Sequence, residues 1–228
     1  MFHVEPQFAN LWSALQKTLK QRNSLLRRDK ISYQDLSPWD IEFCAIAEKI
    51  HLLRTGVFDH FKQLFTTELQ ISAVGKGLEA QFAYVPGWDV DKSFEDVLKQ
   101  DFERDRRDGY THHGPQRADI KITVSEKPAA DVLRRGQEKA LICAMYIAQA
   151  RLYQQRTQKN CVFLIDDLLA ELDQQHCKQL AAWLTVLKGQ VLVTGISKEG
   201  LLDAWCEQDT NVALFHVKQG KVKIEDNK

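Results

Sequence analysis

The sequence predicts an α/β protein in which a partly parallel sheet flanked by helices follows an N-terminal lobe of antiparallel helices. Apolar residues recur at helical spacing through residues 8–28 and again from Ile41 to Leu64. In the second half, two short apolar runs, 161–165 and 190–194, are separated by a helical pattern. The order strand, helix, strand implies parallel pairing through a right-handed crossover.

The composition of the 228 residues excludes several classes of protein. Hydrophobic residues make up 44% and charged residues 27%, which excludes disorder along the whole chain. Lys+Arg and Asp+Glu are 31 each, so nucleic-acid binding would depend on local basic patches. No apolar run is long enough to cross a bilayer, and the N-terminus lacks the pattern of a secretory signal. We therefore expect no membrane partner. The five cysteines form no CxxC pair, which favours a reduced, cytoplasmic protein.

Two long helices are predicted to form a helical lobe over residues 1–69. In the first, over residues 8–28, basic side chains lie between the apolar ones. In the second, Ser37 is predicted to cap the helix with Pro38 in its first turn, and the apolar pattern then runs to Leu64. The two helices are expected to pack against each other along one apolar stripe.

Shorter elements are predicted over residues 70–228. Gly75 and Gly77 break the helical pattern, and LEAQFAYVPGW predicts a strand that ends at its Pro-Gly turn. The near-continuous apolar run 161–165 predicts a strand buried on both faces. The other predicted elements are a charged amphipathic helix at 93–108, a half-buried strand at 118–124, helices at 136–155 and 174–187, a strand at 190–194 and a closing hairpin around Gly220.

Four carboxylates follow the apolar strand within eight residues: Asp166, Asp167, Glu171 and Asp173. A strand that ends in acids places them at the carboxyl edge of a sheet, where open α/β folds bind ligands. Two adjacent carboxylates repel each other, and a cation such as Mg²⁺ would relieve that repulsion. The alternative is a solvated acidic helix start. The spacing alone leaves both interpretations open.

A second candidate site is the segment Arg134-Arg135-Gly136-Gln137, which directly precedes an apolar-striped helix. A glycine at a helix N-terminus exposes backbone N–H groups at the positive end of the helix dipole, which suits phosphate. The flanking arginines would add charge-assisted hydrogen bonds. Alternatively, Gly136 serves only as a helix cap.

Several ordered segments together resemble the RecF family. LRRGQEKALICAMYIAQARL, CVFLIDDLLAELD and QVLVTGIS are similar to the C-terminal part of RecF proteins, as are FERDRRDGYTHHGPQRADIKI and the opening MFHVEPQFANLWSALQKTLKQRNSLLRR. The resemblance therefore covers nearly the whole chain. It implies an ABC-type, SMC/Rad50-like ATPase head, of which residues 1–69 would form the second half of the helical lobe and residues 70–228 the C-terminal half of the ATPase lobe.

The resemblance also implies ATP and Mg²⁺ as cofactors, with the nucleotide held between two protomers of an ATP-dependent homodimer. Arg135, Gly136 and Gln137 match the signature motif, which contacts the γ-phosphate of the nucleotide on the partner. Asp166 matches the Walker B acid that holds Mg²⁺. Asp167 stands where many relatives carry a catalytic Glu that polarises the attacking water.

Three further positions match the nucleotide-binding pattern, and two depart from it. Glu171 and Asp173 match the D-loop that crosses the dimer seam, and Thr194 stands where many ABC proteins have a switch histidine. The signature serine is replaced by Arg134 and the D-loop serine by Ala170. Both changes weaken the case for nucleotide-driven dimerisation.

The phosphate-binding P-loop of the family is missing from this sequence. No GxxxxGK[ST] motif occurs, and Gly75-Lys76-Gly77-Leu78 lacks the first glycine and the hydroxyl. Backbone amides wrapped around the phosphates are needed to hold Mg-ATP, so Asp166 alone would not bind it tightly. We therefore expect a truncated reading frame or a fragment of a longer protein, without ATPase activity of its own.

The resemblance implies DNA as a partner, because RecF proteins bind duplex beside single-stranded gaps and act with RecO and RecR in loading RecA and supporting the SOS response. The candidate DNA-binding residues on the first helix are Lys17, Lys20, Arg27 and Arg28, together with Arg22. Phosphate contacts need only such clusters. A second cluster, Arg104 to Arg107 with Arg117, is interleaved with acids, and a solvated helix face is favoured there. His112 and His113 are interpreted as turn residues.

Two alternatives to a DNA-repair ATPase remain open. One is a non-catalytic dimerisation or RecR-binding module derived from such a head. The other is a fragment of an SMC-like or overcoming-lysogenisation-type nuclease head. The sequence carries neither a long coiled coil nor a metal-nuclease motif after the last strand, which argues against this second alternative.

Overall fold

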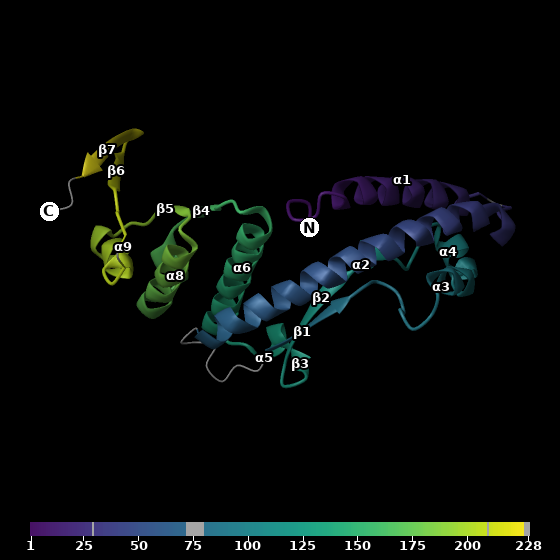
Figure 1. Ribbon diagram of the computed structural model, residues 1–228, viewed down its shortest axis with the longest axis horizontal. Helices are drawn as coiled ribbons and strands as arrows, with labels where there is room; N and C mark the ends of the chain where they lie inside the picture. Colours follow the sequence, from purple (N-terminus) through teal and green to yellow (C-terminus); the bar gives the residue numbers. More distant parts are fainter. Residues whose placement is uncertain (29, 72–79, 209, 226–228) are drawn as a thin grey trace. The chain divides into compact units, whose positions relative to one another are not determined.

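The computed structural model describes residues 1–28, 30–71, 80–208 and 210–225 (Figure 1). The chain divides into two compact units, Met1–Lys159 and Asn160–Lys228. The predicted break at Gly75 and Gly77 lies outside the described residues, and the division into family lobes at residue 69 stays a prediction. No helix in the described ranges is both long and apolar enough to cross a membrane.

Two long helices, packed side by side, make up much of the first unit. Helix α1, Phe8–Leu26, lies along helix α2, Tyr33–Ile71 (Figure 1). The predicted start of α2 at Ser37 is wrong, and Pro38 lies inside the helix. The reason is a reciprocal cap one turn earlier, in which the Asp35 amide donates to Ser32 Oγ and the Ser32 amide donates to Asp35 Oδ2.

Two short helices cover one end of this pair. Helix α3, Phe94–Gln100, begins at Ser93, whose Oγ accepts from the Asp96 amide. Helix α4, Phe102–Asp108, ends at Gly109, which takes a left-handed conformation with φ 72°. The predicted single helix over 93–108 is therefore interrupted at Asp101. The core between α1, α2 and α3 is built from Phe8, Leu15, Phe43, Ile50 and Leu98.

The rest of the first unit confirms the predicted strands and the predicted long helix. Strand β1, Ala80–Val85, pairs antiparallel with β2, Asp119–Val124, and β3, Lys127–Pro128, continues the sheet. The remaining elements are the short helices η1, Pro115–Arg117, and α5, Ala129–Val132, and the long helix α6, Arg135–Thr157. Helix α6 packs on α2, where Arg151 Nε lies 2.6 Å from Oε1 of the buried Glu68.

The second unit contains the predicted parallel strand pair. Strand β4, Val162–Ile165, and strand β5, Gln190–Val193, are parallel and are connected through helices α7, Leu168–Glu171, and α8, Gln174–Leu187. Helix α9, Lys198–Trp205, follows. Strands β6, Leu214–Lys218, and β7, Lys221–Glu225, form the predicted hairpin.

Strand β4 is not buried on both faces as its apolar sequence predicts. Val162 is 60% exposed and Leu164 is 79% exposed, whereas the alternating Phe163 and Ile165 are partly buried. Side chains of a strand point alternately to the two faces. Within the described part of this unit, only the face that carries Phe163 and Ile165 is covered.

Candidate functional site

The predicted carboxylates lie at one edge of the parallel strand pair. Ile165 and Val193 are register partners, so the residues that follow them, Asp166 and Thr194, leave the sheet at the same edge. Thr194 Oγ1 donates to Asp166 Oδ1 over 2.6 Å and accepts from the Asp167 amide over 2.8 Å. The structure thus brings Asp166, Asp167 and Thr194 together, with one hydroxyl group bonded to the carboxylate of Asp166 and to the backbone of Asp167.

Asp167 has an unusual backbone conformation. Its φ of 46° and ψ of 52° lie in the left-handed region, which costs free energy for a residue other than glycine, although less for Asp than for most. The Leu168 amide donates to the Thr194 carbonyl at 3.2 Å and so closes the turn against β5. Both Asp166 and Asp167 remain exposed, so their carboxylates are accessible to a ligand.

The two acids of the predicted D-loop, Glu171 and Asp173, lie at the end of helix α7 and at the start of helix α8. Asp173 caps helix α8: its Oδ1 accepts from the His176 amide at 3.0 Å and lies 2.6 Å from His176 Nδ1. The hydrogen bond from the His176 amide is the main reason that the pKa of Asp173 is lowered. Glu171 is the exposed last residue of α7. Asp173 therefore has a local structural role whether or not it contacts a nucleotide.

The described residues contain no group of three or more His, Cys, Asp or Glu side chains that could hold a metal ion. Mg²⁺ keeps several waters and is usually bound by one or two carboxylates together with substrate phosphates. The exposed Asp166 supplies one such carboxylate, and the exposed Thr194 hydroxyl lies beside it. The residues present therefore fit a Mg²⁺–nucleotide complex better than a metal ion bound by the protein alone.

The predicted signature residues lie at the start of α6. Arg134 is the N-cap, and its amide donates to Gln137 Oε1 over 3.1 Å. Gly136 is exposed, and a Cβ built there would meet nothing within 4 Å. Because Arg134 is the N-cap, the interpretation of Gly136 as a helix cap is wrong. Among the described residues, no neighbouring atom requires a glycine at this position either. This turn belongs to the first compact unit, whereas Asp166 belongs to the second.

The candidate DNA-binding residues lie on an exposed side of α1 and just after its end. Lys17, Lys20, Arg27 and Arg28 are all exposed. Lys17, Lys20 and Arg27 line a shallow surface hollow whose lining contains no acid. The structure thus places three of the four along one hollow.

Arg22 is not part of the exposed basic cluster, contrary to the prediction. Its side chain is fully buried, with Nε 2.6 Å from Asp40 Oδ1 and Nη1 2.6 Å from Asp105 Oδ2. Nη1 also donates to Thr111 Oγ1 at 2.7 Å. The position of Arg22 between the buried Thr18 and Leu26 in the helical repeat is a signal in the sequence that could have revealed this.

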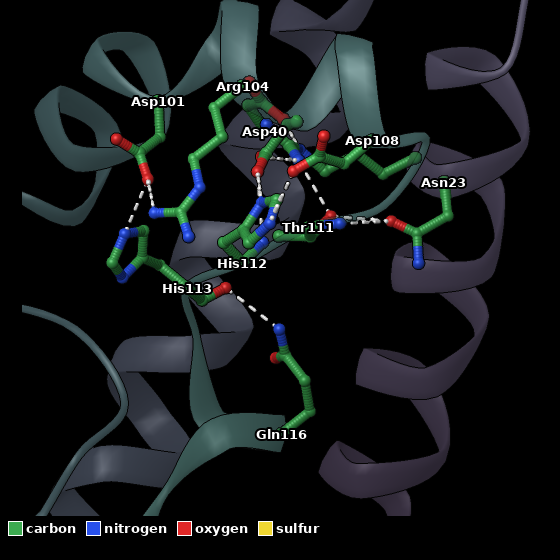
Figure 2. A network of polar contacts seen from close by, with 11 residues as sticks. Asn23, Asp40, Asp101, Arg104, Asp108, Thr111, His112, His113 and Gln116 are labelled. Atoms are coloured by element: carbon green, nitrogen blue, oxygen red, sulfur yellow. Dashed lines mark hydrogen bonds and ion pairs between the residues drawn. The ribbon is translucent and has the colours of Figure 1, made fainter.

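Two histidines extend this network (Figure 2). The His112 ring lies between two carboxylates, with Nδ1 2.7 Å from Asp105 Oδ1 and Nε2 3.1 Å from Asp108 Oδ2. His113 Nε2 lies 2.7 Å from Asp101 Oδ2. Sequence reasoning missed this network, because its members come from α1, α2, α4 and the segment after Gly109.

Sequence comparisons show which known proteins the chain resembles. No protein-family model matches the chain. It is 44% identical over 223 residues to "DNA replication and repair protein RecF" of Cellvibrio japonicus, covering 97% of this chain and 60% of that protein. The RecF of Saccharophagus degradans is 41% identical over 226 residues, which cover 98% of this chain and 62% of that protein. The chain therefore spans about three fifths of the length of these curated relatives.

Solved structures show the same relationship in three dimensions. Two structures of "the recombination mediator protein RecF" in the RecFOR pathway, titled as RecF-ATPrS and RecF-ATP, each align with a TM-score of 0.77. Their sequences are 19% and 18% identical, and the alignments cover 97% and 98% of this chain but 59% and 60% of theirs. Over the part of RecF that it spans, the chain is therefore similar in sequence to the curated RecF proteins and similar in fold to the solved RecF structures.

Proposed function

We propose that the chain is part of a RecF-type DNA replication and repair protein and supplies two pieces of an ATP site formed between two copies of that protein. The observation that carries the proposal is the edge at which Thr194 is hydrogen-bonded to Asp166 and Asp167. An exposed acid at the carboxyl end of a parallel strand, with its carboxylate oriented by a hydroxyl group that follows the neighbouring strand, suits a nucleotide with its Mg²⁺.

Each residue of this edge has a proposed task. Asp166 would hold Mg²⁺, and the hydroxyl of Thr194 keeps the Asp166 carboxylate in place through a 2.6 Å hydrogen bond. The exposed carboxylate of Asp167 would orient the attacking water, with Glu171 and Asp173 at the dimer seam. When bound, Mg²⁺ would neutralise charge on the phosphates of ATP.

The start of α6 would act on the nucleotide of the other copy. Arg135 and Gly136 are exposed, and Gln137 is partly exposed, in the first helical turn, where backbone N–H groups attract phosphate. The sequence contains no GxxxxGK[ST] motif, so the phosphate cradle has to come from sequence outside this chain. The ATPase activity is therefore proposed for the larger RecF-type protein.

The proposal is tested in a graft, in which this chain replaces the segment that it matches in Cellvibrio japonicus RecF. We expect the graft to bind Mg-ATP and Asp166→Ala to weaken that binding by about tenfold or more, because a metal-binding carboxylate is lost. Asp59→Ala, at an exposed position on α2, is the matched control. A fluorescent ATP analogue reports the affinity.

Two results would contradict the proposal. Unchanged affinity of the Asp166→Ala graft would exclude Asp166 from the nucleotide site. A folded graft that does not bind ATP at all would instead favour a non-catalytic dimerisation or RecR-binding module.

We further propose that the protein binds DNA beside single-stranded gaps through Lys17, Lys20, Arg27 and Arg28. With RecR and RecO, it would support the loading of RecA and the SOS response. The supporting observation is the exposed basic side of α1, because phosphate contacts require lysine and arginine but no particular base sequence. Replacing Lys17 and Lys20 with glutamine is expected to weaken DNA binding about tenfold at ~0.1 M salt.

A further inference from the structure

The end of α1 meets the end of α4 in a corner that carries four arginines. A surface hollow there is lined by Arg27 and Arg28, which follow α1, and by Arg106 and Arg107 of α4. Two acids, Glu103 and Asp108, also line it. The two arginine pairs are far apart in the sequence, and folding brings them to one hollow with an excess of positive charge.

The two acids do not neutralise all of the positive charge of this corner. Arg106 Nη2 lies 2.7 Å from Glu103 Oε2, and Arg107 Nε lies 3.0 Å from Asp108 Oδ1. Both are pairs of neighbours on one helix, and both arginines and Glu103 are exposed, whereas Asp108 is 28% exposed. An exposed pair such as Arg106 with Glu103 contributes about 0–1 kcal/mol, so a phosphate can replace this acid at little cost.

The corner continues into the basic hollow along α1. Arg27 lines both hollows, and the second one adds Lys17 and Lys20. From Lys17 to Leu26, the last residue of α1, the helix advances by about 14 Å. One DNA strand places about four phosphates in that length, at roughly 3.4 Å each. The surface therefore matches an extended polyanion better than a single small anion.

We propose that Arg106 and Arg107 belong, with Arg27, Arg28, Lys17 and Lys20, to one continuous surface that binds the phosphate backbone of DNA. This inference rests on the DNA-binding part of the proposed function and adds a second helix to it. It also revises the interpretation of the Arg104 to Arg107 segment as merely solvated.

The corner is held in shape before any ligand binds. Beneath it, Arg22 joins α1 to Asp40 of α2 and to Asp105 of α4. Arg27 Nε donates to the Gly109 carbonyl at 3.2 Å, and a Cβ on Gly109 would lie 3.2 Å from Arg27 Cγ. Since the two helix ends are already fixed together, ordering them on binding costs little free energy.

The test uses the full chain and a fluorescent DNA duplex with a single-stranded tail, with binding followed by anisotropy over a series of salt concentrations. Arg106→Gln/Arg107→Gln is expected to weaken binding about tenfold at ~0.1 M salt. It should also reduce the slope of log K against log salt by about 1 to 2, because phosphate contacts are lost. Arg106→Lys/Arg107→Lys keeps the charge and should retain most of the affinity and the slope.

Two further variants calibrate this result. Lys17→Gln/Lys20→Gln tests the α1 surface alone. Lys121→Gln/Lys127→Gln removes two exposed lysines from β2 and β3, away from the two hollows, and should bind like the parent chain.

The possible outcomes separate the inference from the proposed function. If the Arg106/Arg107 glutamine variant binds like the parent while the Lys17/Lys20 variant is weakened, the inference is wrong and the DNA proposal stands. Equal losses in the Lys121/Lys127 variant would contradict a localised surface. Equally tight, equally arginine-dependent binding to anionic lipid vesicles would also contradict it. If the parent chain does not bind DNA, the DNA proposal fails and the inference fails with it.

Discussion

Replacing Arg22 with methionine is expected to lower the free energy of unfolding by about 3–5 kcal/mol, because it leaves two buried carboxylates without their cation. Arg22 is fully buried, and Asp40 and Asp105 are each 1% exposed. Methionine fills similar space but supplies no charge. Urea denaturation followed by circular dichroism measures the change.

The effect of Arg22→Met should depend on pH in a defined direction. Burial raises the pKa of Asp40, and the nearby Arg22 guanidinium opposes that rise. Without Arg22 the pKa of Asp40 rises further. A carboxyl whose pKa is higher in the folded state loses stability as the pH rises from its unfolded pKa, about 4, through its folded pKa. The deficit of the variant should therefore shrink as the pH falls from neutral toward about 4.

Two comparison variants make the Arg22 prediction specific. Asp40→Asn added to Arg22→Met should recover part of the lost stability and flatten the pH dependence, because one unpaired buried charge is gone. Arg28→Met, at an exposed position just after the same helix, should change stability by less than about 0.5 kcal/mol. If Arg22→Met were no more destabilising than Arg28→Met, the buried network would not hold α1 and α4 together.

Asp167→Asn in the graft is expected to reduce ATP turnover by about 100-fold or more while leaving Mg-ATP affinity nearly unchanged. A positioned general base typically contributes about 10² to 10⁴-fold to a rate, and the amide cannot accept the proton. Asparagine also tolerates the left-handed conformation that Asp167 adopts, so the local fold should survive. Phosphate release at saturating ATP measures turnover.

The control for Asp167→Asn is Asp131→Asn, an exposed acid on α5. Turnover of this control should equal that of the parent graft. Full turnover in the Asp167→Asn graft would show that another group orients the water and would remove Asp167 from the proposed mechanism.

Local patterns in the sequence predicted the main elements and one edge of the site. Helices α1 and α8 and the parallel pairing of β4 with β5 follow from periodicity and element order. The location of Asp166 at the carboxyl edge of the sheet follows from its place directly after an apolar strand. The hydroxyl that is hydrogen-bonded to both aspartates was not predictable, since it depends on the register between strands.

The features that the sequence did not predict depend on contacts between distant segments. Pro38 suggested a helix start, but the cap at Ser32 and Asp35 extends the helix upstream. Arg22 appeared as one of several basic residues, although its acidic partners lie 18 and 83 positions away. The apolar sequence of β4 also does not specify which of its faces another element covers.

ATP-dependent dimerisation of the graft, measured by sedimentation, tests most directly whether the chain contributes both pieces of a shared nucleotide site. A Cβ at the exposed Gly136 would meet nothing within 4 Å, so Gly136→Glu should fold and bind ATP normally. We expect Mg-ATP to convert the parent graft to a dimer and the Gly136→Glu graft to stay monomeric, because the added carboxylate would face the partner's γ-phosphate. A Gly136→Glu graft that dimerises at the same ATP concentration as its parent would contradict this proposal.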